Sequence, residues 1–535
     1  MSEWIQEKSC GAVVYRYVSK KRFYLIEHME AGHYAHCKGH VEENETEKET
    51  AVREIKEETG HDIRFIGDFK ESTSYSPYEN CIKEVIYFLA ECTGGEEKAQ
   101  LEEVTDILWL SYEDALATLT YDDDKRILKQ AEEYLLKKEK ETKMSRYDTD
   151  YSKMGLSTRA IKLGEGVDPL TKALNTPIYE TSTYGYETAE EYDEMLALGA
   201  AWTPDIYIYS RTTNPTTNVL EKKVISLEHA EDAVITGCGM AAISTALFAN
   251  LDAGDHVICS DDTFMCTSSL FADILPAKGI ETSRVEVLDV SNVEKAMRPN
   301  TKVVYLEALS NPQLKLADLP AIAEIAHKHG CKFIVDNTFL SPIVMRPLEW
   351  GADIVVHSGT KYYSGHGDAL VGIVAGSKKD IDRIRYYYDN FGSHISPFEA
   401  WLTLRSVRTM PLRVRKQSEN ALALAKWFSE REEVDFVTYP GLESHKQHEL
   451  AKKMFTEGIF GGMLCVHLKG GHEEMCRFAD ATRIPPVATS LGDVVTLMFP
   501  KTAYNNLIRF SIGCEDVEDL IADFTQAFEA MKQGE

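Results

Sequence analysis

The sequence predicts a multidomain α/β protein: a first α/β domain, a charged linker, a larger α/β domain with a mostly parallel sheet, and a smaller C-terminal α+β domain. Three observations support this fold class. The 535 residues are too many for one hydrophobic core, and at about 150 residues per domain they suggest three or four domains. A charged segment without apolar periodicity follows Leu136. Beyond it, apolar strands alternate with helices, which is typical of a parallel sheet covered on both faces.

The expected boundaries follow from these changes in pattern. We expect a first domain over residues 1–140, a linker over 141–154, a large domain with an N-terminal arm over 155–398, and a small domain over 399–535. In the first domain, β-like segments at 11–17, 23–28 and 82–92 surround one strong helix at 45–59. Met144 lies in the linker and would serve as the start of a free-standing enzyme, which suggests that two genes were joined.

The large domain shows five short apolar runs that we interpret as buried strands. They lie at 233–236, 256–259, 303–306, 333–336 and 354–356, with helical segments between them. From about residue 400 the pattern changes to longer helices with a few alternating strands, which favours an α+β domain.

Composition and charge argue against several classes of function. The 58 basic and 86 acidic residues give a net charge of −28, so neither nucleic acid nor an anionic membrane is an expected partner. Eleven scattered cysteines without a Cys-x-x-Cys pair indicate reduced thiols. The first residues lack the features of a signal peptide, and no run of about 18 apolar residues occurs. We therefore expect a cytoplasmic protein.

Three carboxylates share one face of the helix expected at 45–59. Glu54, Glu57 and Glu58 stand at positions i, i+3 and i+4, so their charges repel one another. A hard cation such as Mg²⁺ would remove that repulsion, because it binds oxygen ligands. Arg53 can hold one carboxylate in position. The alternative interpretation is an acidic face that is simply exposed to solvent.

The same helix carries start and stop signals. Asn44 can cap its N-terminus while Glu47, three residues later, completes a capping box. Gly60 can supply the left-handed residue that ends it. With Gly39 and Glu45 at fixed distances before Arg53 to Gly60, the pattern resembles the Nudix box, and the resemblance extends over residues 8–137.

The Nudix resemblance implies an α/β/α fold and a metal-dependent hydrolysis of a nucleoside polyphosphate. Glu54, Glu57 and Glu58 would bind Mg²⁺ or Mn²⁺, with Glu57 and Glu58 acting in catalysis. Segments 38–42, 74–77 and 109–115 look like the subgroup that hydrolyses diadenosine tetraphosphate, and by analogy Tyr75 would stack on the base.

The segment before this box departs from the subgroup. His36-Cys37 stands where an aromatic residue and a proline are usual, so the substrate loop is expected to be altered. Two alternatives therefore stay open beside hydrolysis. The domain could bind a nucleotide without cleaving it and regulate the rest of the chain, or it could contribute only solubility or assembly.

A second set of residues lies in the large domain, where a carboxylate and a lysine each follow a predicted strand. A carboxylate such as Asp336 beside a pyridine nitrogen keeps that nitrogen protonated, and an amine such as that of Lys361 can bind pyridoxal phosphate and move a substrate α-proton. Ser358 and Thr360 can donate hydrogen bonds to phosphate oxygens.

A glycine-containing turn at 236–242 offers a second phosphate element. Gly239 and Met240 stand between a strand and a helix, where backbone amides bind phosphate. Taken alone, Gly-x-Gly-x-x-Ala after a strand also fits a dinucleotide-binding fold. A dehydrogenase would, however, leave Asp336 and Lys361 unexplained.

Together these motifs resemble the cystathionine γ-synthase and γ-lyase family of pyridoxal phosphate enzymes, over about residues 155–532. The resemblance implies a fold-type I enzyme that acts on a homoserine-derived or sulfur amino acid by γ-replacement or γ-elimination. Tyr209 and Arg211 match residues that reach the phosphate of a neighbouring subunit, which implies at least a dimer, and we expect a tetramer. Asn311 would touch the cofactor, and Ser490 and Arg509 would bind the substrate carboxylate.

Phe264 is the most informative departure from this family, because relatives usually place a tyrosine over the cofactor ring. A phenylalanine can still stack on the ring but cannot deliver a proton to a γ-leaving group. Good leaving groups, such as that of an acylated homoserine, should suffer less than the thiol of methionine. Cys266 instead favours elimination from methionine, since its position corresponds to a cysteine of methionine γ-lyases.

Overall fold

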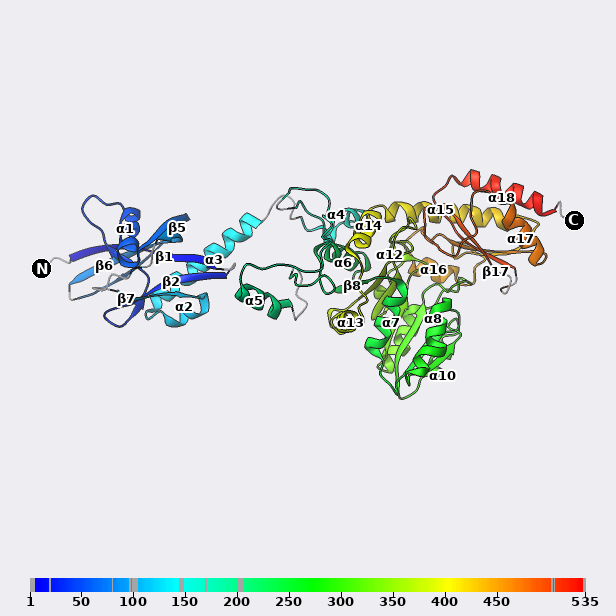
Figure 1. The fold of residues 1–535 in the computed structure, drawn as a ribbon, viewed down its shortest axis with the longest axis horizontal. Coiled ribbons are helices and arrows are strands. Elements are labelled where there is room, and N and C mark those ends of the chain that lie inside the picture. The colour runs from blue at the N-terminus through cyan, green and yellow to red at the C-terminus, as the bar shows by residue number, and fades with distance from the viewer. Residues whose placement is uncertain are drawn as a thin grey trace. The chain divides into compact units, whose positions relative to one another are not determined.

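The computed structural model describes residues 5–18, 21–78, 80–95, 98, 104–143, 149–168, 171–199, 206–501, 504 and 506–532. The chain divides into two compact units, Met1–Asp148 and Thr149–Glu535, so the division lies within the predicted linker (Figure 1). Each unit has hydrophobic cores of its own.

Unit 1 contains a mixed seven-stranded sheet in the order β3-β2-β1-β6-β5, with β4 paired to β1 and β7 paired to β2. β1 and β6 run parallel, whereas the other pairs are antiparallel. The elements are β1 (Ile5–Val18), β2 (Lys21–Met29), β3 (Tyr34–Ala35), β4 (Lys38–His40), α1 (Glu47–Thr59), β5 (His61–Tyr75), β6 (Cys81–Gly95), β7 (Val104–Leu110), α2 (Tyr112–Thr118) and α3 (Asp122–Lys143).

The start of α1 differs from the sequence prediction. Thr46, not Asn44, caps the helix, and its partner in the capping box is Glu49 rather than Glu47. Asn44 has a φ of 73°, a left-handed turn conformation, whereas Thr46 has the extended backbone of an N-cap residue. The end of the helix agrees with the prediction, because Gly60 adopts the left-handed conformation with a φ of 78°.

Helix α3 runs three residues into the segment predicted as a linker, since it ends at Lys143. Three consecutive aspartates, Asp122–Asp124, lie in its first turn, where carboxylates interact favourably with the helix dipole. Ile127, Leu128 and Ala131 are fully buried against the sheet, so packing of one apolar face anchors the helix.

Unit 2 is built on a seven-stranded sheet in the order β10-β9-β11-β12-β13-β14-β8. The first five strands run parallel, and β14 and β8 complete the sheet in antiparallel pairs. The strands are β8 (Asp232–Thr236), β9 (His256–Ser260), β10 (Glu281–Val285), β11 (Thr301–Glu307), β12 (Lys332–Asp336), β13 (Ile354–Ser358) and β14 (Gly372–Gly376). All five predicted apolar runs are therefore strands, and the mostly parallel sheet is confirmed.

Helices cover both faces of this sheet and bury its apolar side chains in two separate clusters. One cluster includes α6 (Pro215–Glu228) and α11 (Leu319–Lys328), and the other includes α7 (Gly239–Asn250) and α13 (Lys378–Phe391). In such sheets ligands bind beyond the carboxyl ends of the strands. Asp336 and Ser358 each end a strand of this sheet.

The C-terminal part of unit 2 forms a four-stranded antiparallel sheet in the order β15-β16-β18-β17. Its elements include α14 (Pro397–Val407), α15 (Met410–Ser429), β15 (Val434–Thr438), β16 (Met463–Leu468), α17 (His472–Ala481), β17 (Leu497–Lys501), β18 (Leu507–Ser511) and α18 (Val517–Lys532). The aromatic rings of Phe428, Phe510 and Phe524 pack together between these helices and the sheet. This is the α+β arrangement that the sequence predicts after residue 400.

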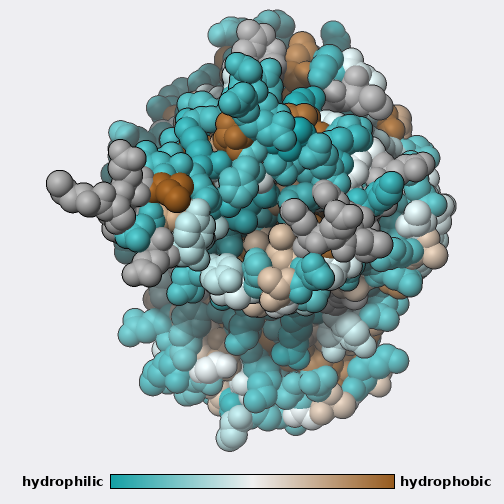
Figure 2. Space-filling view, turned by 90° about the vertical axis from the view of Figure 1, so that its left-hand side faces the viewer, coloured by the Kyte–Doolittle hydropathy of each residue, from teal (hydrophilic) through white to brown (hydrophobic). Residues whose placement is uncertain are grey.

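The face drawn in Figure 2 is mostly hydrophilic, and its hydrophobic residues are scattered rather than gathered in one patch. Among the described residues, none of the helices is long and apolar enough to cross a membrane.

Candidate active sites

A cavity of about 770 Å³ opens at the carboxyl ends of the strands in unit 2. It brings together most of the residues that the sequence predicts for binding pyridoxal phosphate. Those that line it are Gly239, Met240, Phe264, Asn311, Asp336, Ser358, Thr360 and Lys361, and Arg509, predicted for the substrate carboxylate, lines it as well. Residues of separate chain segments therefore meet in one place.

Lys361 lies three residues after the end of β13 and turns its amine into this cavity. Nζ donates a hydrogen bond to Ser490 Oγ at 3.2 Å. Burial, assisted by the positive charge of Arg509, lowers the pKa of Lys361. A larger fraction of its amine is therefore unprotonated than in a solvent-exposed lysine, which suits a nucleophile that attacks an aldehyde.

Asp336 is buried at the end of β12, and each of its two carboxylate oxygens accepts a hydrogen bond. One carboxylate oxygen accepts from the backbone N–H of Thr338 at 2.9 Å, and the other accepts from the Tyr305 hydroxyl at 3.3 Å. Burial raises the pKa of Asp336, although the hydrogen bonds from Thr338 oppose that shift. A pyridinium N–H beside this carboxylate would offset the cost of burying its charge.

Two backbones approach each other closely where the sequence leads us to expect the phosphate. Gly239 starts α7, and a Cβ at this position would lie 2.7 Å from Ser358 Cβ, so only glycine fits. The Thr360 hydroxyl accepts from the Val371 N–H at 2.9 Å. Helix N-terminal amides and two hydroxyls thus line one end of the cavity, and the donor set fits a phosphate.

Arg509 lies on β18 and is almost fully buried. Its guanidinium donates to Asn311 Oδ1 at 2.8 Å and to the Thr489 carbonyl at 3.0 Å. Arg509 Nε has no hydrogen-bond partner within the described part of the chain. The guanidinium therefore keeps a donor that a carboxylate could accept from.

The structure adds Glu307, which sequence reasoning missed. Glu307 ends β11 directly beside Asp336 on β12 and lines the cavity. Its carboxylate accepts from the backbone N–H of Phe264 at 2.6 Å and from that of Asn311 at 3.0 Å. Burial and the neighbouring Asp336 charge raise the pKa of Glu307. The signal was present in the sequence, because Glu307 follows an apolar strand just as Asp336 does.

Three predicted residues are not among those that line the cavity: Ser490, whose hydroxyl accepts from Lys361, and Tyr209 and Arg211. Tyr209 is 41% exposed, and the Arg211 guanidinium carbon lies 5.1 Å from the centroid of its ring. Neither residue lines the cavity of its own chain. Their expected action on the site of a second copy stays a prediction.

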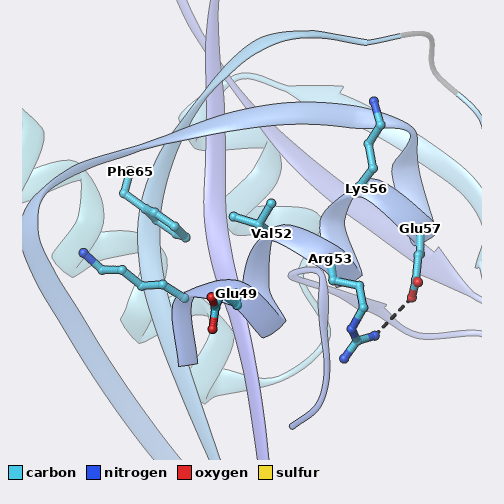
Figure 3. Close-up of a pocket in the computed structure, with 7 residues that line it drawn as sticks. Glu49, Val52, Arg53, Lys56, Glu57 and Phe65 are labelled. Atoms are coloured by element: carbon cyan, nitrogen blue, oxygen red, sulfur yellow. Dashed lines mark hydrogen bonds and ion pairs between the residues drawn. The ribbon is translucent and has the colours of Figure 1, made fainter. Parts of the chain in front are cut away.

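In unit 1, one arginine gathers the predicted acidic residues of α1. Arg53 donates to Glu54 Oε1 at 2.9 Å, to Glu57 Oε2 at 3.1 Å, and to Glu45 Oε1 at 2.7 Å. Figure 3 shows the Arg53–Glu57 contact on the side of a shallow pocket along α1. A Cβ on Gly39 would collide with the Glu54 carboxyl group, so this glycine lets the β4 backbone approach the carboxylate.

Glu58 points the other way, into the interior of unit 1. It is buried, and Cys37 Sγ lies 2.7 Å from its Oε2. Burial is the main reason that the pKa of Glu58 is raised to about 7. The three carboxylates offer the oxygen ligands that Mg²⁺ prefers, but they do not share one surface. Tyr75 ends β5 with an exposed ring.

Comparisons with known proteins show a family for each of the two parts of the chain. Residues 157–529 match the Cys/Met metabolism PLP-dependent enzyme family, and residues 9–131 match the NUDIX domain. An L-methionine gamma-lyase of Treponema denticola is 37% identical over 402 residues, which cover 71% of this chain and 98% of the relative. The O-succinylhomoserine sulfhydrylase of Pseudomonas aeruginosa is 36% identical over 402 residues, which cover 72% of this chain and 98% of the relative.

The fold of unit 2 has solved counterparts as well. The crystal structure of metB from Corynebacterium glutamicum matches with a TM-score of 0.67 and 34% identity, covering 71% of this chain and 99% of that one. The expected order, a Nudix fold followed by a fold-type I pyridoxal phosphate enzyme, is confirmed. The chain therefore belongs to the Cys/Met metabolism family of PLP-dependent enzymes and carries a NUDIX domain ahead of that enzyme.

Proposed function

We propose that unit 2 catalyses γ-replacement or γ-elimination on a homoserine-derived or sulfur amino acid. The observation that carries this proposal is the amine of Lys361, which shares one cavity with Asp336 and Arg509. Bound pyridoxal phosphate supplies an electron sink that stabilises negative charge when the substrate loses its α-proton. A carboxylate, a cation and a lysine amine are the groups that this chemistry requires from the protein.

Each residue has a separate task in this proposal. Lys361 attaches the cofactor and then moves the substrate α-proton, which its depressed pKa favours. Asp336 keeps the pyridine nitrogen protonated. Arg509 binds the substrate carboxylate, and Ser490, which accepts a hydrogen bond from Lys361, orients the amine. The phosphate is held by Gly239, Met240, Ser358 and Thr360.

The choice between the two reactions depends on Phe264. Its ring lines the cavity and is 41% exposed, and it has no hydroxyl that could protonate a leaving group. We therefore propose that replacement on an acylated homoserine is faster than elimination from methionine. Relatives of both kinds resemble the chain to similar degrees, since a methionine gamma-lyase and an O-succinylhomoserine sulfhydrylase are 37% and 36% identical.

One assay separates these reactions. The full chain is given O-acetylhomoserine with sulfide, cystathionine, or methionine, and homocysteine, 2-oxobutyrate and methanethiol are quantified. The proposal expects homocysteine from O-acetylhomoserine to form fastest, and a Phe264→Tyr variant to increase methanethiol release. Faster methanethiol release by the unaltered protein, or a variant with unchanged product ratios, would contradict it.

The site is expected to be completed by a second copy of the chain. Tyr209 and Arg211 lie outside their own cavity, which supports a role in the cavity of a neighbour within a dimer or tetramer. Mixing inactive Lys361→Ala chains with Arg211→Ala chains should restore part of the activity, because a mixed dimer contains one intact site. No recovery after subunit exchange, demonstrated by differently tagged chains, would count against a shared site.

For unit 1 we propose Mg²⁺- or Mn²⁺-dependent hydrolysis of a nucleoside polyphosphate such as diadenosine tetraphosphate. Arg53 holds Glu54 and Glu57 together, and this arrangement of carboxylates supports the proposal. The full chain with Mg²⁺ should release nucleotides from this substrate, and Glu57→Gln should abolish release while the amino-acid reaction continues. Nucleotide binding without release would instead favour a regulatory module.

A further inference from the structure

Three polar side chains meet inside unit 1, away from solvent. Glu27 lies on β2, Cys37 follows β3, and Glu58 lies next to the end of α1; they are 1%, 1% and 2% exposed. The thiol sulfur and one oxygen of each carboxylate all lie within 4.8 Å of one another. Within the cluster, Cys37 Sγ lies 2.7 Å from Glu58 Oε2.

The cluster is not satisfied by hydrogen bonds alone. Glu27 Oε1 is buried and has no hydrogen-bond partner within the described part of the chain. Two buried acids and a thiol thus face one another, an arrangement that a cation would stabilise.

We propose that Glu27, Cys37 and Glu58 form a binding site for one Zn²⁺ ion. Zinc accepts thiolate sulfur and carboxylate oxygen in a tetrahedral arrangement, and three protein ligands leave the fourth position for water. A thiolate ligand disfavours the hard cations Mg²⁺ and Ca²⁺. Binding displaces the thiol proton and any proton that the carboxyl groups hold, and these protons are released to solvent.

This site shares Glu58 with the predicted Mg²⁺ ligands of α1, but its other two ligands are different. Glu54 and Glu57 are engaged by Arg53, whereas Glu27 and Cys37 come from other elements and reach only Glu58. Glu58 would be a ligand in the zinc site and in the predicted Mg²⁺ site. Zinc bound to Glu58 would therefore leave any Mg²⁺ site without this ligand. The zinc site itself does not depend on nucleotide hydrolysis, so its test does not measure that activity.

The test counts tight zinc sites in the full chain saturated with pyridoxal phosphate. A Cys476→Ala background is used, because Cys476 Sγ lies 3.6 Å from His472 Nε2 on α17 and this pair could bind zinc at the surface. After removal of metal, zinc is titrated against a chromophoric chelator. We expect one tight equivalent, lost in both Cys37→Ala and Glu27→Gln. Cys81→Ala, which removes another fully buried thiol of unit 1, should retain it.

X-ray absorption at the zinc edge provides the second readout. It should show one sulfur neighbour at about 2.3 Å together with oxygen neighbours. Circular dichroism checks that the variants fold. If Cys37→Ala does not fold, the nearly isosteric Glu27→Gln variant still tests the site. The proposal is overturned if the background protein binds no tight zinc, if both variants retain it, or if the bound zinc has no sulfur ligand.

Discussion

Replacing Glu307 by glutamine tests whether this buried carboxylate positions the cofactor-binding residues. Its two oxygens accept from the backbone N–H groups of Phe264 and Asn311, at 2.6 and 3.0 Å. Glutamine keeps the shape but offers only one oxygen, so its NH₂ group must face one of these N–H donors. One buried hydrogen bond is therefore lost, and either Phe264 or Asn311 moves.

The size of the effect follows from the lost hydrogen bond. A buried donor that is left without its partner costs about 1–3 kcal/mol. If that energy maintains the catalytic geometry, kcat/KM should fall about 5- to 150-fold. The absorbance maximum of the bound cofactor should shift as well, since Asn311 lines the cavity in which we propose that the cofactor binds. A change in overall stability alone would not produce that shift.

The assay is steady-state formation of homocysteine from O-acetylhomoserine and sulfide, with the cofactor spectrum recorded on the same samples. Glu324→Gln, a glutamate of α11 in the same unit that lies outside the cavity, serves as the matched control and should behave like the unaltered protein. Glu307 has no positioning role if Glu307→Gln folds normally and changes kcat/KM less than twofold with an unchanged spectrum.

Two further substitutions address neighbouring parts of the cavity. Arg509→Lys keeps the charge but cannot reproduce the guanidinium contacts with Asn311 and Thr489. The KM for the amino acid should therefore rise about tenfold or more, while kcat changes less. A fall in kcat as large as the rise in KM would contradict a binding role for Arg509. Gly239→Ala places a methyl group 2.7 Å from Ser358 Cβ. The affinity for pyridoxal phosphate, measured by cofactor titration, should therefore fall at least tenfold. An unchanged affinity would contradict the proposed phosphate site.

The sheet of unit 2 could be predicted from the sequence because its strands are short, buried and apolar. Parallel strands bring their carboxyl ends to one edge, so the strand pattern alone is enough to expect Asp336 and Lys361 in one site. Glu307 obeys the same rule and could have been found in the same way. The rule does not, however, predict that two backbone N–H groups donate to this carboxylate, and its positioning role depends on them.

Other features depend on information that sequence spacing does not contain. Asn44 with Glu47 and Thr46 with Glu49 both fit a capping box, and only the backbone conformation decides between them. The meeting of Cys37 with Glu58 joins separate elements with no spacing signature. The position of Tyr209 relative to a second chain depends on assembly, which one sequence does not specify.

Everything proposed for unit 2 depends on Lys361 as the residue that binds the cofactor. Reduction of the full chain with borohydride, followed by proteolysis and mass spectrometry, identifies the lysine that carries a pyridoxyl group. We expect the label on the peptide that contains Lys361, and no label at any lysine in a Lys361→Ala variant that still folds. A label on Lys501, which lines the same cavity, or on any other lysine of the unaltered protein would contradict this assignment.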